Sequence, residues 1–355
     1  MTELIQRLDR GRFDVRVACF HKEGAWLERV EACAPVTEFP IQGFARPATL
    51  ARAASFVRWC RAERIKVLQT CDLYANSFAL PAAAWAGVPV RLGSRRELNP
   101  DKSTAQITLQ RHAYRCAHGV VANSSAAARV LEDEGVSRAR IHVISNGVIL
   151  ERFAQRTEQR PLTTIITVAN LRQEKAHEVL LAAAAQLAPR HPYLQFLIVG
   201  DGPRAAELRA LATTLGIDAH VRFLGHREDV PALLAQSDVY VLPSRSEAFP
   251  NGAIEAMASG LPVVASRVGG LLDLIDNGRT GLLVTPDNPA ALVDALESLL
   301  MSPARAAMLG ATAREEVTQR YSFDRMVRAF EDLYLTQLGT AGAPARPRGV
   351  SSRAA

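Results

Sequence analysis

Two glutamates lie on either side of the start of a short predicted helix. In the stretch SRSEAFPNGAIEAMASG, residues 244–260, Glu247 precedes a break and Glu255 follows about one turn into the helix. The first backbone N–H groups of a helix lack intrahelical partners, and together with the helix dipole they suit a diphosphate. A carboxylate accepts hydrogen bonds from two adjacent hydroxyls, as in a ribose or a hexose. The combination predicts a site for a sugar, a diphosphate and a nucleoside, and the break consists of Phe249, Pro250, Asn251 and Gly252.

Either glutamate taken alone would more often be a solvated surface acid. A second group of charges therefore matters. Arg172 and Lys175 follow a predicted strand in VANLRQEKAHEVLL, residues 168–181, and lie just before the helix that starts near His177. Two fixed cations there can neutralise a leaving diphosphate without a metal, whereas a surface charge pair is the simpler interpretation of this segment alone.

Both groups lie in a regular alternation of predicted strands and helices. Short β-branched runs alternate with helical patterns, which is typical of parallel sheets covered on both faces. We expect an α/β protein with two Rossmann-like, doubly wound parallel-sheet domains facing a cleft, because ligands bind at the carboxyl ends of such strands. The expected parts are an N-terminal domain over 1–155, a second domain over 160–319, a helix over 320–338 that returns toward the N-terminal domain, and a disordered tail over 339–355.

Composition agrees with two globular domains. The chain has 355 residues, 48% of them apolar and 22% charged, which is ordinary for a soluble protein. No run approaches the roughly 20 apolar residues of a membrane span, and the N-terminus lacks a signal peptide, so we expect a cytoplasmic protein. The five cysteines are widely spaced and form no CxxC motif, which disfavours disulfides and structural zinc.

Charge is concentrated in the N-terminal half. Residues 1–155 contain 22 Lys and Arg against 15 Asp and Glu, a net of +7, and the remaining residues have 20 against 21, a net of −1. A basic half could face phosphates, acidic lipid headgroups or nucleic acid, and an ordinary arginine-rich surface is the alternative. Aromatic residues are sparse among these charges, which disfavours nucleic acid.

The start of the chain departs from the expected pattern. A doubly wound domain normally opens with a strand and a glycine-rich turn, whereas this sequence begins inside a predicted helix, TELIQRLDRG. Either the start is truncated or the first sheet is short by one strand, and a missing strand would leave unpaired backbone groups and an exposed edge.

The order of motifs in the second half resembles glycosyltransferase family 4, whose fold is called GT-B. The order is NLRxxK, VGDGP, RFLGHRED, PSRSEAFPNGAIEAMASGLPVV, VGG and GRTGLLV. The resemblance covers nearly all of residues 1–338, and its most specific element is E-x7-E, met by Glu247 and Glu255. It implies transfer with retention of configuration, no bound metal and no cofactor, the nucleotide sugar being a co-substrate. Consistently, the chain has no Asp-x-Asp motif.

The resemblance also implies roles for single residues. Glu255 would hold the ribose of the donor, and Glu247 would lie against the transferred sugar, as would the backbone of Phe249, Pro250, Asn251 and Gly252. Arg172 and Lys175 would grip the diphosphate, and backbone from Gly225 to Arg227 would border the base.

Three positions depart from the family pattern. The glycine-rich loop after the first strand is absent. In VPVRLGSRRE, residues 88–97, Arg95 stands where many relatives have a histidine near the transferred sugar, with Ser94 and Arg96 beside it. On this basis Ser94 and Arg95 are predicted to contact the donor. Ala176 replaces the usual glycine after the lysine.

We therefore expect a metal-independent glycosyltransferase that moves a sugar from a UDP- or GDP-linked donor to a hydroxyl of a glycan or lipid-linked acceptor. It would work in the cytoplasm or at the inner face of a membrane, with peripheral membrane association and no nucleic-acid partner. The alternatives are a non-catalytic nucleotide-sugar-binding subunit, a truncated inactive enzyme and a UDP-sugar epimerase of the same fold. A dinucleotide-dependent dehydrogenase is disfavoured because GDGP is only part of the G-x-G-x-x-G fingerprint.

Overall fold

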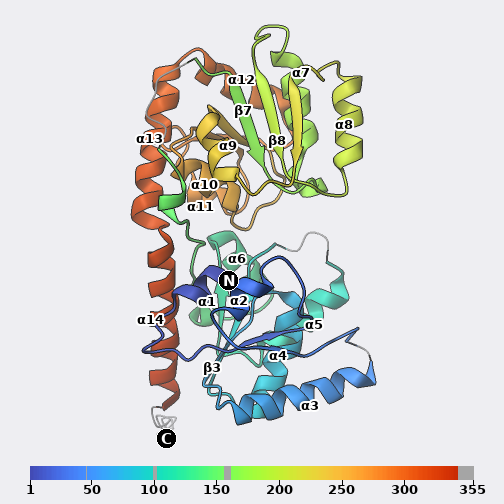
Figure 1. Ribbon diagram of the computed structural model, residues 1–355, viewed down its shortest axis with the longest axis vertical. Helices are drawn as coiled ribbons and strands as arrows, with labels where there is room; N and C mark the ends of the chain where they lie inside the picture. The colour runs from blue at the N-terminus through green and yellow to red at the C-terminus, as the bar shows by residue number, and fades with distance from the viewer. Residues whose placement is uncertain (45, 99–101, 156–160, 343–355) are drawn as a thin grey trace, which may run out of the picture. The chain divides into compact units, whose positions relative to one another are not determined.

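The computed structural model describes residues 1–44, 46–98, 102–155 and 161–342 (Figure 1). Their contacts divide the chain into two compact units. The first unit contains Met1–Ser94, Thr108–Val120 and the chain from Val327 onward, and the second contains Arg95–Ile107 and Val121–Met326. Among the described residues, no helix is both long and apolar enough to cross a membrane.

The second unit contains a six-stranded sheet in which every strand runs parallel to its neighbours. Its order is β12-β11-β10-β7-β8-β9, so that β7 lies in the middle with β10 and β8 on either side. The predicted parallel sheet is confirmed. The strands are β7 (Thr164–Val168), β8 (Gln195–Val199), β9 (Val221–Gly225), β10 (Val239–Leu242), β11 (Val263–Ser266) and β12 (Leu282–Val284).

Helices follow most of these strands and cover the sheet (Figure 1). One of them has a well-defined start: Asn288 caps α12, its side chain accepting a hydrogen bond from the Ala291 N–H at 3.0 Å, and Pro289 opens the first turn. The helices of this unit are α7 (His177–Leu187), α8 (Ala205–Thr214), α9 (Val230–Gln236), α10 (Asn251–Ala258), α11 (Leu271–Leu274), α12 (Pro289–Leu300) and α13 (Pro303–Arg320). The next helix, α14 (Phe323–Gly342), begins in this unit, and its residues from Val327 onward belong to the first unit.

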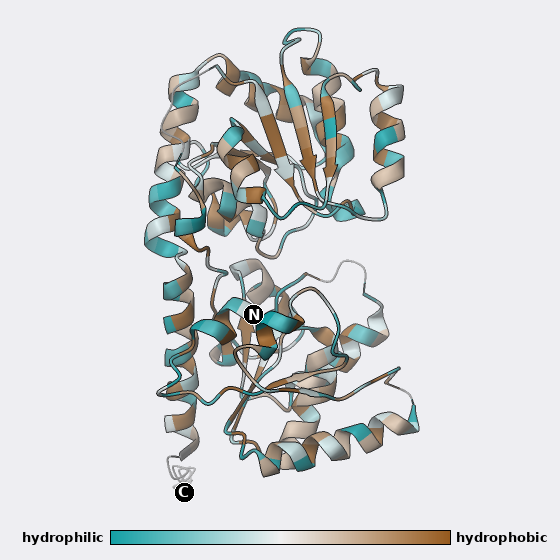
Figure 2. Cartoon of the chain, in the orientation of Figure 1, coloured by the Kyte–Doolittle hydropathy of each residue, from teal (hydrophilic) through white to brown (hydrophobic). Residues whose placement is uncertain are grey.

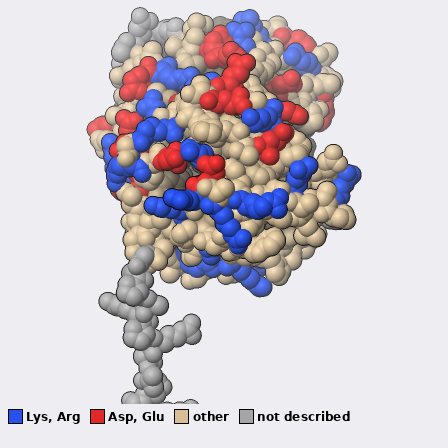
Figure 3. Space-filling model, turned by 60° about the horizontal axis from the view of Figure 1, so that its bottom comes forward, with Lys and Arg blue, Asp and Glu red and all other residues tan. Residues whose placement is uncertain are grey.

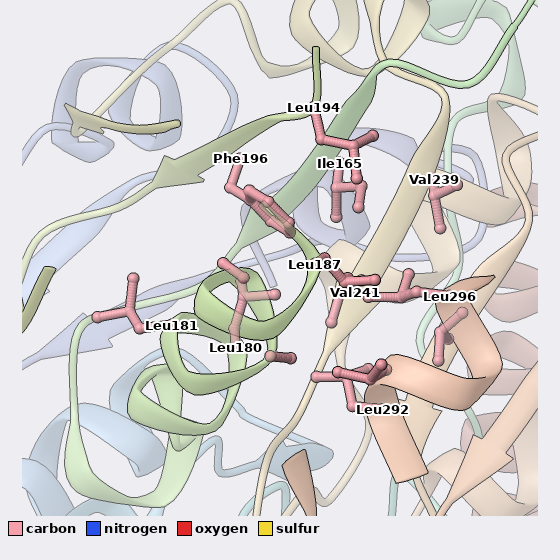
Figure 4. Close-up of a cluster of buried hydrophobic side chains, with 14 of the residues drawn as sticks. Ile165, Leu180, Leu181, Leu187, Leu194, Phe196, Val239, Val241, Leu292 and Leu296 are labelled. Atoms are coloured by element: carbon pink, nitrogen blue, oxygen red, sulfur yellow. The ribbon is translucent and has the colours of Figure 1, made fainter. Parts of the chain in front are cut away.

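Apolar packing holds the helices on the sheet. On one face, α7 and α12 pack against β7, β8 and β10, with side chains such as Leu180, Phe196, Val241 and Leu296 fully buried (Figure 4). The strands are largely apolar along their length (Figure 2), as expected for a parallel sheet covered on both faces. The core thereby holds the carboxyl ends of β7, β8 and β10 at one edge.

A buried carboxylate fixes the other edge of the two central strands. Asp238 is fully buried just before β10, and its Oδ2 accepts hydrogen bonds from the N–H groups of Thr163 and Thr164, both at 2.8 Å. Because a buried carboxylate is costly without such donors, these bonds hold the starts of β7 and β10 in register.

The N-terminal part of the chain contains two sheets. In the described residues β1 pairs in parallel with β2, and a separate sheet has the order β3-β4-β5-β6, in which β3 and β4 run parallel. The elements are β1 (Val17–Cys19), β2 (Val36–Glu38), β3 (Val67–Gln69), β4 (Val90–Arg95), β5 (Gly119–Ala122), β6 (Ile141–Val143), α1 (Thr2–Arg7), α2 (Leu27–Glu31), α3 (Pro47–Ala62), α4 (Leu73–Ala86), α5 (Thr104–Tyr114) and α6 (Ser125–Asp133).

Within the first unit, the last helix packs against the N-terminal segment. Glu331 of α14 accepts a hydrogen bond from the Asp9 N–H at 2.8 Å, and the rings of Phe13 and Tyr334 meet edge to face with centroids 6.0 Å apart. The helix runs to Gly342, past the predicted end at residue 338, so the predicted disordered tail from 339 begins inside it. Residues 343–355 lie outside the described residues.

Candidate active site

The carboxyl ends of β7, β8 and β10 border a pocket of about 490 Å³. Its walls come from the loops that follow these strands, from the segment after β9 and from the start of α10. Arg96, Glu97 and Leu98, which belong to the same compact unit, complete the lining. Most of the predicted donor-site residues line this pocket: Arg172, Lys175, Arg227, Glu247, Phe249, Pro250, Asn251, Gly252 and Glu255.

The start of α10 lies unusually close to the sheet. A Cβ atom on Gly252 would lie 2.5 Å from the Tyr240 Oη and 2.6 Å from the Val168 carbonyl oxygen, so only glycine fits there. Pro250 occupies the N-cap position and no side chain caps the helix. The N–H groups of the first turn are therefore left without a side-chain cap, and of its residues Asn251 and Gly252 line the pocket, whereas Ala253 does not.

Glu247 is oriented by two donors. The Lys175 Nζ and the Ser244 Oγ each donate to its Oε1 at 2.7 Å, and only 5% of the residue is exposed. A buried carboxylate that is paired with an ammonium and bonded to a hydroxyl is held in one position. The arrangement also fixes Lys175, whose long side chain would otherwise be free to turn.

The VGG turn supports Glu247 from behind. The Gly270 N–H donates to the Glu247 carbonyl at 2.8 Å. A Cβ on Gly269 or Gly270 would lie within 2 Å of the carbonyl oxygen of Glu247 or Ala248 respectively. These glycines therefore permit a backbone contact that no other residue would allow, which gives the VGG motif a structural role.

Glu255 lies in a different environment from Glu247. Burial raises the pKa of its carboxyl group to about 7, and the nearby positive charge of Arg152 acts in the opposite direction. Tyr240 is fully buried and close enough to both glutamates to feel their charges, and its hydroxyl donates to the Val168 carbonyl at 3.3 Å. Burial, followed by the charges of Glu247 and Glu255, raises the pKa of Tyr240 well above its usual value. A hydroxyl ligand would supply the hydrogen bonds that an ionised Glu255 lacks.

The segment after β9 places two predicted residues differently. The Arg227 guanidinium lines the pocket but is bonded through two nitrogens to Asp229, at 2.7 and 2.6 Å. Gly225 ends β9 with a left-handed φ of 66° and is not among the residues that line the pocket, whereas its neighbour His226 is. The Gly225 carbonyl accepts a hydrogen bond from the Gly200 N–H at 2.8 Å, so this turn is joined to the loop that follows β8.

Ser94 and Arg95 also lie outside the lining of this pocket. The Ser94 Oγ donates to the Thr70 carbonyl within the first unit. The Arg95 side chain is 2% exposed, and its two terminal nitrogens contact the carboxylate of Glu134 at 2.9 and 3.0 Å. In this segment it is the next arginine, Arg96, that lines the pocket, together with Arg172 and Arg227 from other loops.

Several residues of the site carry no recognisable motif of their own. Ser244 and Tyr240 are examples: the first bonds Glu247 and the second supports Gly252. Tyr240 is the one polar side chain in the strand sequence VYVL, which is the only signal that could have pointed to it. Among the described residues, no cluster of three or more His, Cys, Asp or Glu could hold a metal ion.

Two family models together account for most of the chain. Residues 1–152 match the model of Glycosyltransferase Family 4, and residues 150–316 match that of Glycosyl transferases group 1. The chain belongs to glycosyltransferase family 4. The resemblance noted in its motifs is thereby confirmed.

Family 4 relatives with curated names cover only part of this chain. The D-inositol 3-phosphate glycosyltransferase of Corynebacterium urealyticum is 34% identical over 236 residues, which is 61% of this chain and 55% of the relative. The glycogen synthase of Mycobacterium tuberculosis is 34% identical over 205 residues, or 57% and 50%. The chain spans about half the length of the curated relatives that it matches.

A family 4 fold is also seen among solved structures. The structure of Anabaena HepE in complex with UDP and glucose has a TM-score of 0.84 and 23% identity, and the match covers 94% of both chains. This likeness confirms the predicted fold class, two Rossmann-like domains in the GT-B arrangement.

The raised pKa of Glu255 predicts a pH dependence of stability. The carboxyl group ionises near pH 4.5 in the unfolded chain but only near pH 7 in the folded one. Its contribution is therefore present at low pH and is lost as the pH rises through 7. Between pH 5 and pH 8 the free energy of unfolding should fall by about 2.5 kcal/mol from this group.

Urea unfolding of the wild type and of Glu255→Gln at both pH values measures this contribution. The variant cannot ionise, so its stability relative to the wild type should rise by that amount between pH 5 and pH 8. An equal pH dependence of the two proteins would show that Glu255 has an ordinary pKa.

Proposed function

We propose that this family 4 protein transfers a sugar from a UDP- or GDP-linked donor to a hydroxyl of a glycan or lipid-linked acceptor, with retention of anomeric configuration. The observation that carries the proposal is the uncapped start of α10, which lies between Glu247 and Glu255 and in the same pocket as Lys175. Support comes from the relatives named glycosyltransferases and from the HepE structures with UDP and UDP-glucose.

The chemistry follows from where charge develops. The bond between the anomeric carbon and the diphosphate breaks and its electron pair stays on the diphosphate. The acceptor oxygen bonds to the same face of the sugar, and its proton passes to the departing diphosphate oxygen. Positive charge grows on the sugar and negative charge on the leaving group. Arg172, Lys175 and the N–H groups at the start of α10 would stabilise the diphosphate, and Glu247 would orient or stabilise the sugar.

Lys175 is paired with Glu247, which would face the sugar, and would itself stabilise the negative charge of the leaving diphosphate. Its ammonium bonds Glu247, a residue only 5% exposed, so the chain itself holds this cation in place. A cation held in advance needs little reorganisation when the leaving group forms, which is the usual source of electrostatic catalysis. Loss of one such contact should lower the rate by on the order of 10² to 10³.

Two other functions remain as alternatives. A UDP-sugar epimerase of this fold would alter the donor sugar without an acceptor, and a non-catalytic subunit would bind the donor and leave it unchanged. An assay of donor consumption with and without added acceptor separates the three, because only a transferase forms a new glycoside that depends on acceptor.

The donor site itself can be tested by binding. Isothermal titration with a panel of UDP- and GDP-sugars should identify a donor, and Glu255→Ala should weaken its binding at least tenfold, because hydrogen bonds from the ribose to a carboxylate are lost. Asp294→Ala is the matched control, since Asp294 is an exposed acid of α12 outside the pocket. Unchanged affinity in Glu255→Ala would overturn the ribose assignment.

We also propose that the protein meets its acceptor at an anionic membrane surface. Residues 46–66, which include α3, contain six Lys and Arg and a single acid, Glu63, which is paired with Arg16 at 2.9 Å. Figure 3, in which the end of the molecule that holds α3 comes forward, shows many Lys and Arg and few acids there. Two large apolar side chains are also exposed, Leu50 by 76% and Trp85 by 62%. Basic side chains with exposed aromatic and aliphatic neighbours suit acidic headgroups.

Vesicle sedimentation tests this part of the proposal. The protein should bind vesicles with 30% phosphatidylglycerol more strongly than pure phosphatidylcholine, and less at high salt. At about 1 kcal/mol per basic residue, replacing three exposed arginines by glutamine should reduce partitioning about 100-fold. The triple variant replaces Arg58, Arg61 and Arg64 by glutamine. The matched control replaces Arg209, Arg222 and Arg305 of the second unit in the same way. Equal loss in both variants would indicate net charge alone, and would contradict a specific face.

A further inference from the structure

Arg245 lies in the loop of the candidate active site but does not line the pocket. It stands between Ser244 and Glu247, the two residues that share a hydrogen bond, and its side chain is 33% exposed. The sequence motif gives it no role in donor binding. Its hydrogen bonds lead to the neighbouring loop, residues 172–176, which carries Lys175, and its ion pairs lead to Glu178 and Asp287.

Arg245 holds the 172–176 loop through two backbone carbonyls of that loop. The Arg245 N–H donates to the Glu174 carbonyl at 2.8 Å, and its Nη1 donates to the Gln173 carbonyl at 2.9 Å. These two carbonyls belong to the single 3₁₀ turn Gln173–Lys175. The turn ends at Ala176, which has a left-handed φ of 49°, a conformation that costs about 1 kcal/mol for a residue other than glycine. A short turn with a strained end depends on outside contacts to keep its shape.

The other terminal nitrogen of Arg245 enters a network of charges. Its Nη2 lies 2.7 Å from the Glu178 Oε1 and 2.7 Å from the Asp287 Oδ1. The second oxygen of Glu178 bonds Arg204 at 2.6 Å, and the Arg204 N–H donates to the Leu171 carbonyl at 3.1 Å. Glu178, in the first turn of α7, thus joins the loops that follow β7, β8 and β10.

We propose that Arg245 is a positioning residue for transfer: by holding the 172–176 turn and bonding Glu178, it sets the place of Lys175 relative to Glu247 and to the start of α10. This inference rests on the proposed transfer reaction. Lys175 is held at its tip by Glu247, and Arg245 holds the backbone from which its side chain extends. Loss of the Arg245 side chain removes its bonds to the Gln173 carbonyl and to Glu178 and leaves only the Arg245 N–H bond to Glu174. Lys175 is then freer to move together with its turn.

The expected effect is on the reaction more than on donor recognition. A displacement of about 1 Å in a catalytic group costs on the order of 10² in rate. Ribose binding through Glu255 depends on α10, which Arg245 does not contact in any described hydrogen bond or ion pair. Arg245→Ala should therefore lower kcat 10- to 100-fold and change KM for the donor less than threefold.

Arg279 provides a matched control. It is also an arginine paired with two acids, Asp276 and Glu316, but it lies in the second unit away from the pocket. Arg279→Ala should leave kcat and KM unchanged. Arg245→Lys should restore part of kcat, because an ammonium can pair with Glu178 but lacks the guanidinium fork that also reaches the Gln173 carbonyl.

Hydrogen exchange gives a readout that does not need activity. Amides of residues 172–178 should exchange at least tenfold faster in Arg245→Ala than in the wild type or Arg279→Ala, while amides of α12 remain unchanged. If the wild type transfers no sugar from any donor, the proposed function fails, and the exchange data still decide the role of Arg245. Wild-type exchange together with wild-type kcat in Arg245→Ala would overturn the proposal, and a fall in melting temperature with unchanged kcat would reduce Arg245 to a stabilising residue.

Discussion

The contact between the start of α10 and the two central strands is the constraint on which the site depends. Gly252 lies against the Tyr240 hydroxyl and the Val168 carbonyl, with no room for a Cβ. This close approach brings the free N–H groups of the helix to the carboxyl edge of β7 and β10. The same step places Glu247 in the loop before the helix and Glu255 one turn inside it, so a single backbone contact sets the position of three binding elements.

Charge in the pocket is arranged so that the two glutamates differ. Glu247 is paired with Lys175 and bonded to Ser244, whereas the pKa of Glu255 is raised by burial to about 7. The Glu247 carboxylate, oriented by its two donors, suits the place where positive charge develops on the sugar. The Glu255 carboxylate suits a diol, because the two hydroxyls would donate hydrogen bonds to it. Ionisation of the buried Glu255 lowers the free energy of unfolding at neutral pH. A ligand whose hydroxyls bond the carboxylate would regain that free energy as binding free energy.

The sequence predicted the parts of the site that depend on local order, and much less of what depends on side-chain contacts across loops. Alternating apolar runs were enough for the parallel sheet, and the break from Phe249 to Gly252 was enough for the start of α10. Short elements such as β2, with three residues, have too little periodicity to be found. Arg95 illustrates the other limit: it was predicted to contact the donor, but its guanidinium is bound to Glu134, 39 residues further along the chain. Arg245 was not predicted for the same reason, because its partners lie in the 173–175 turn, in α7 and at Asp287.

The proposed donor site depends on the N–H groups of Asn251, Gly252 and Ala253, which would bind the diphosphate. Hydrogen exchange at these amides, measured with saturating UDP and with uridine as the control ligand, tests this binding. We expect slower exchange at the first turn of α10 with UDP and no change with uridine. Unchanged exchange at these amides while UDP is bound would contradict it.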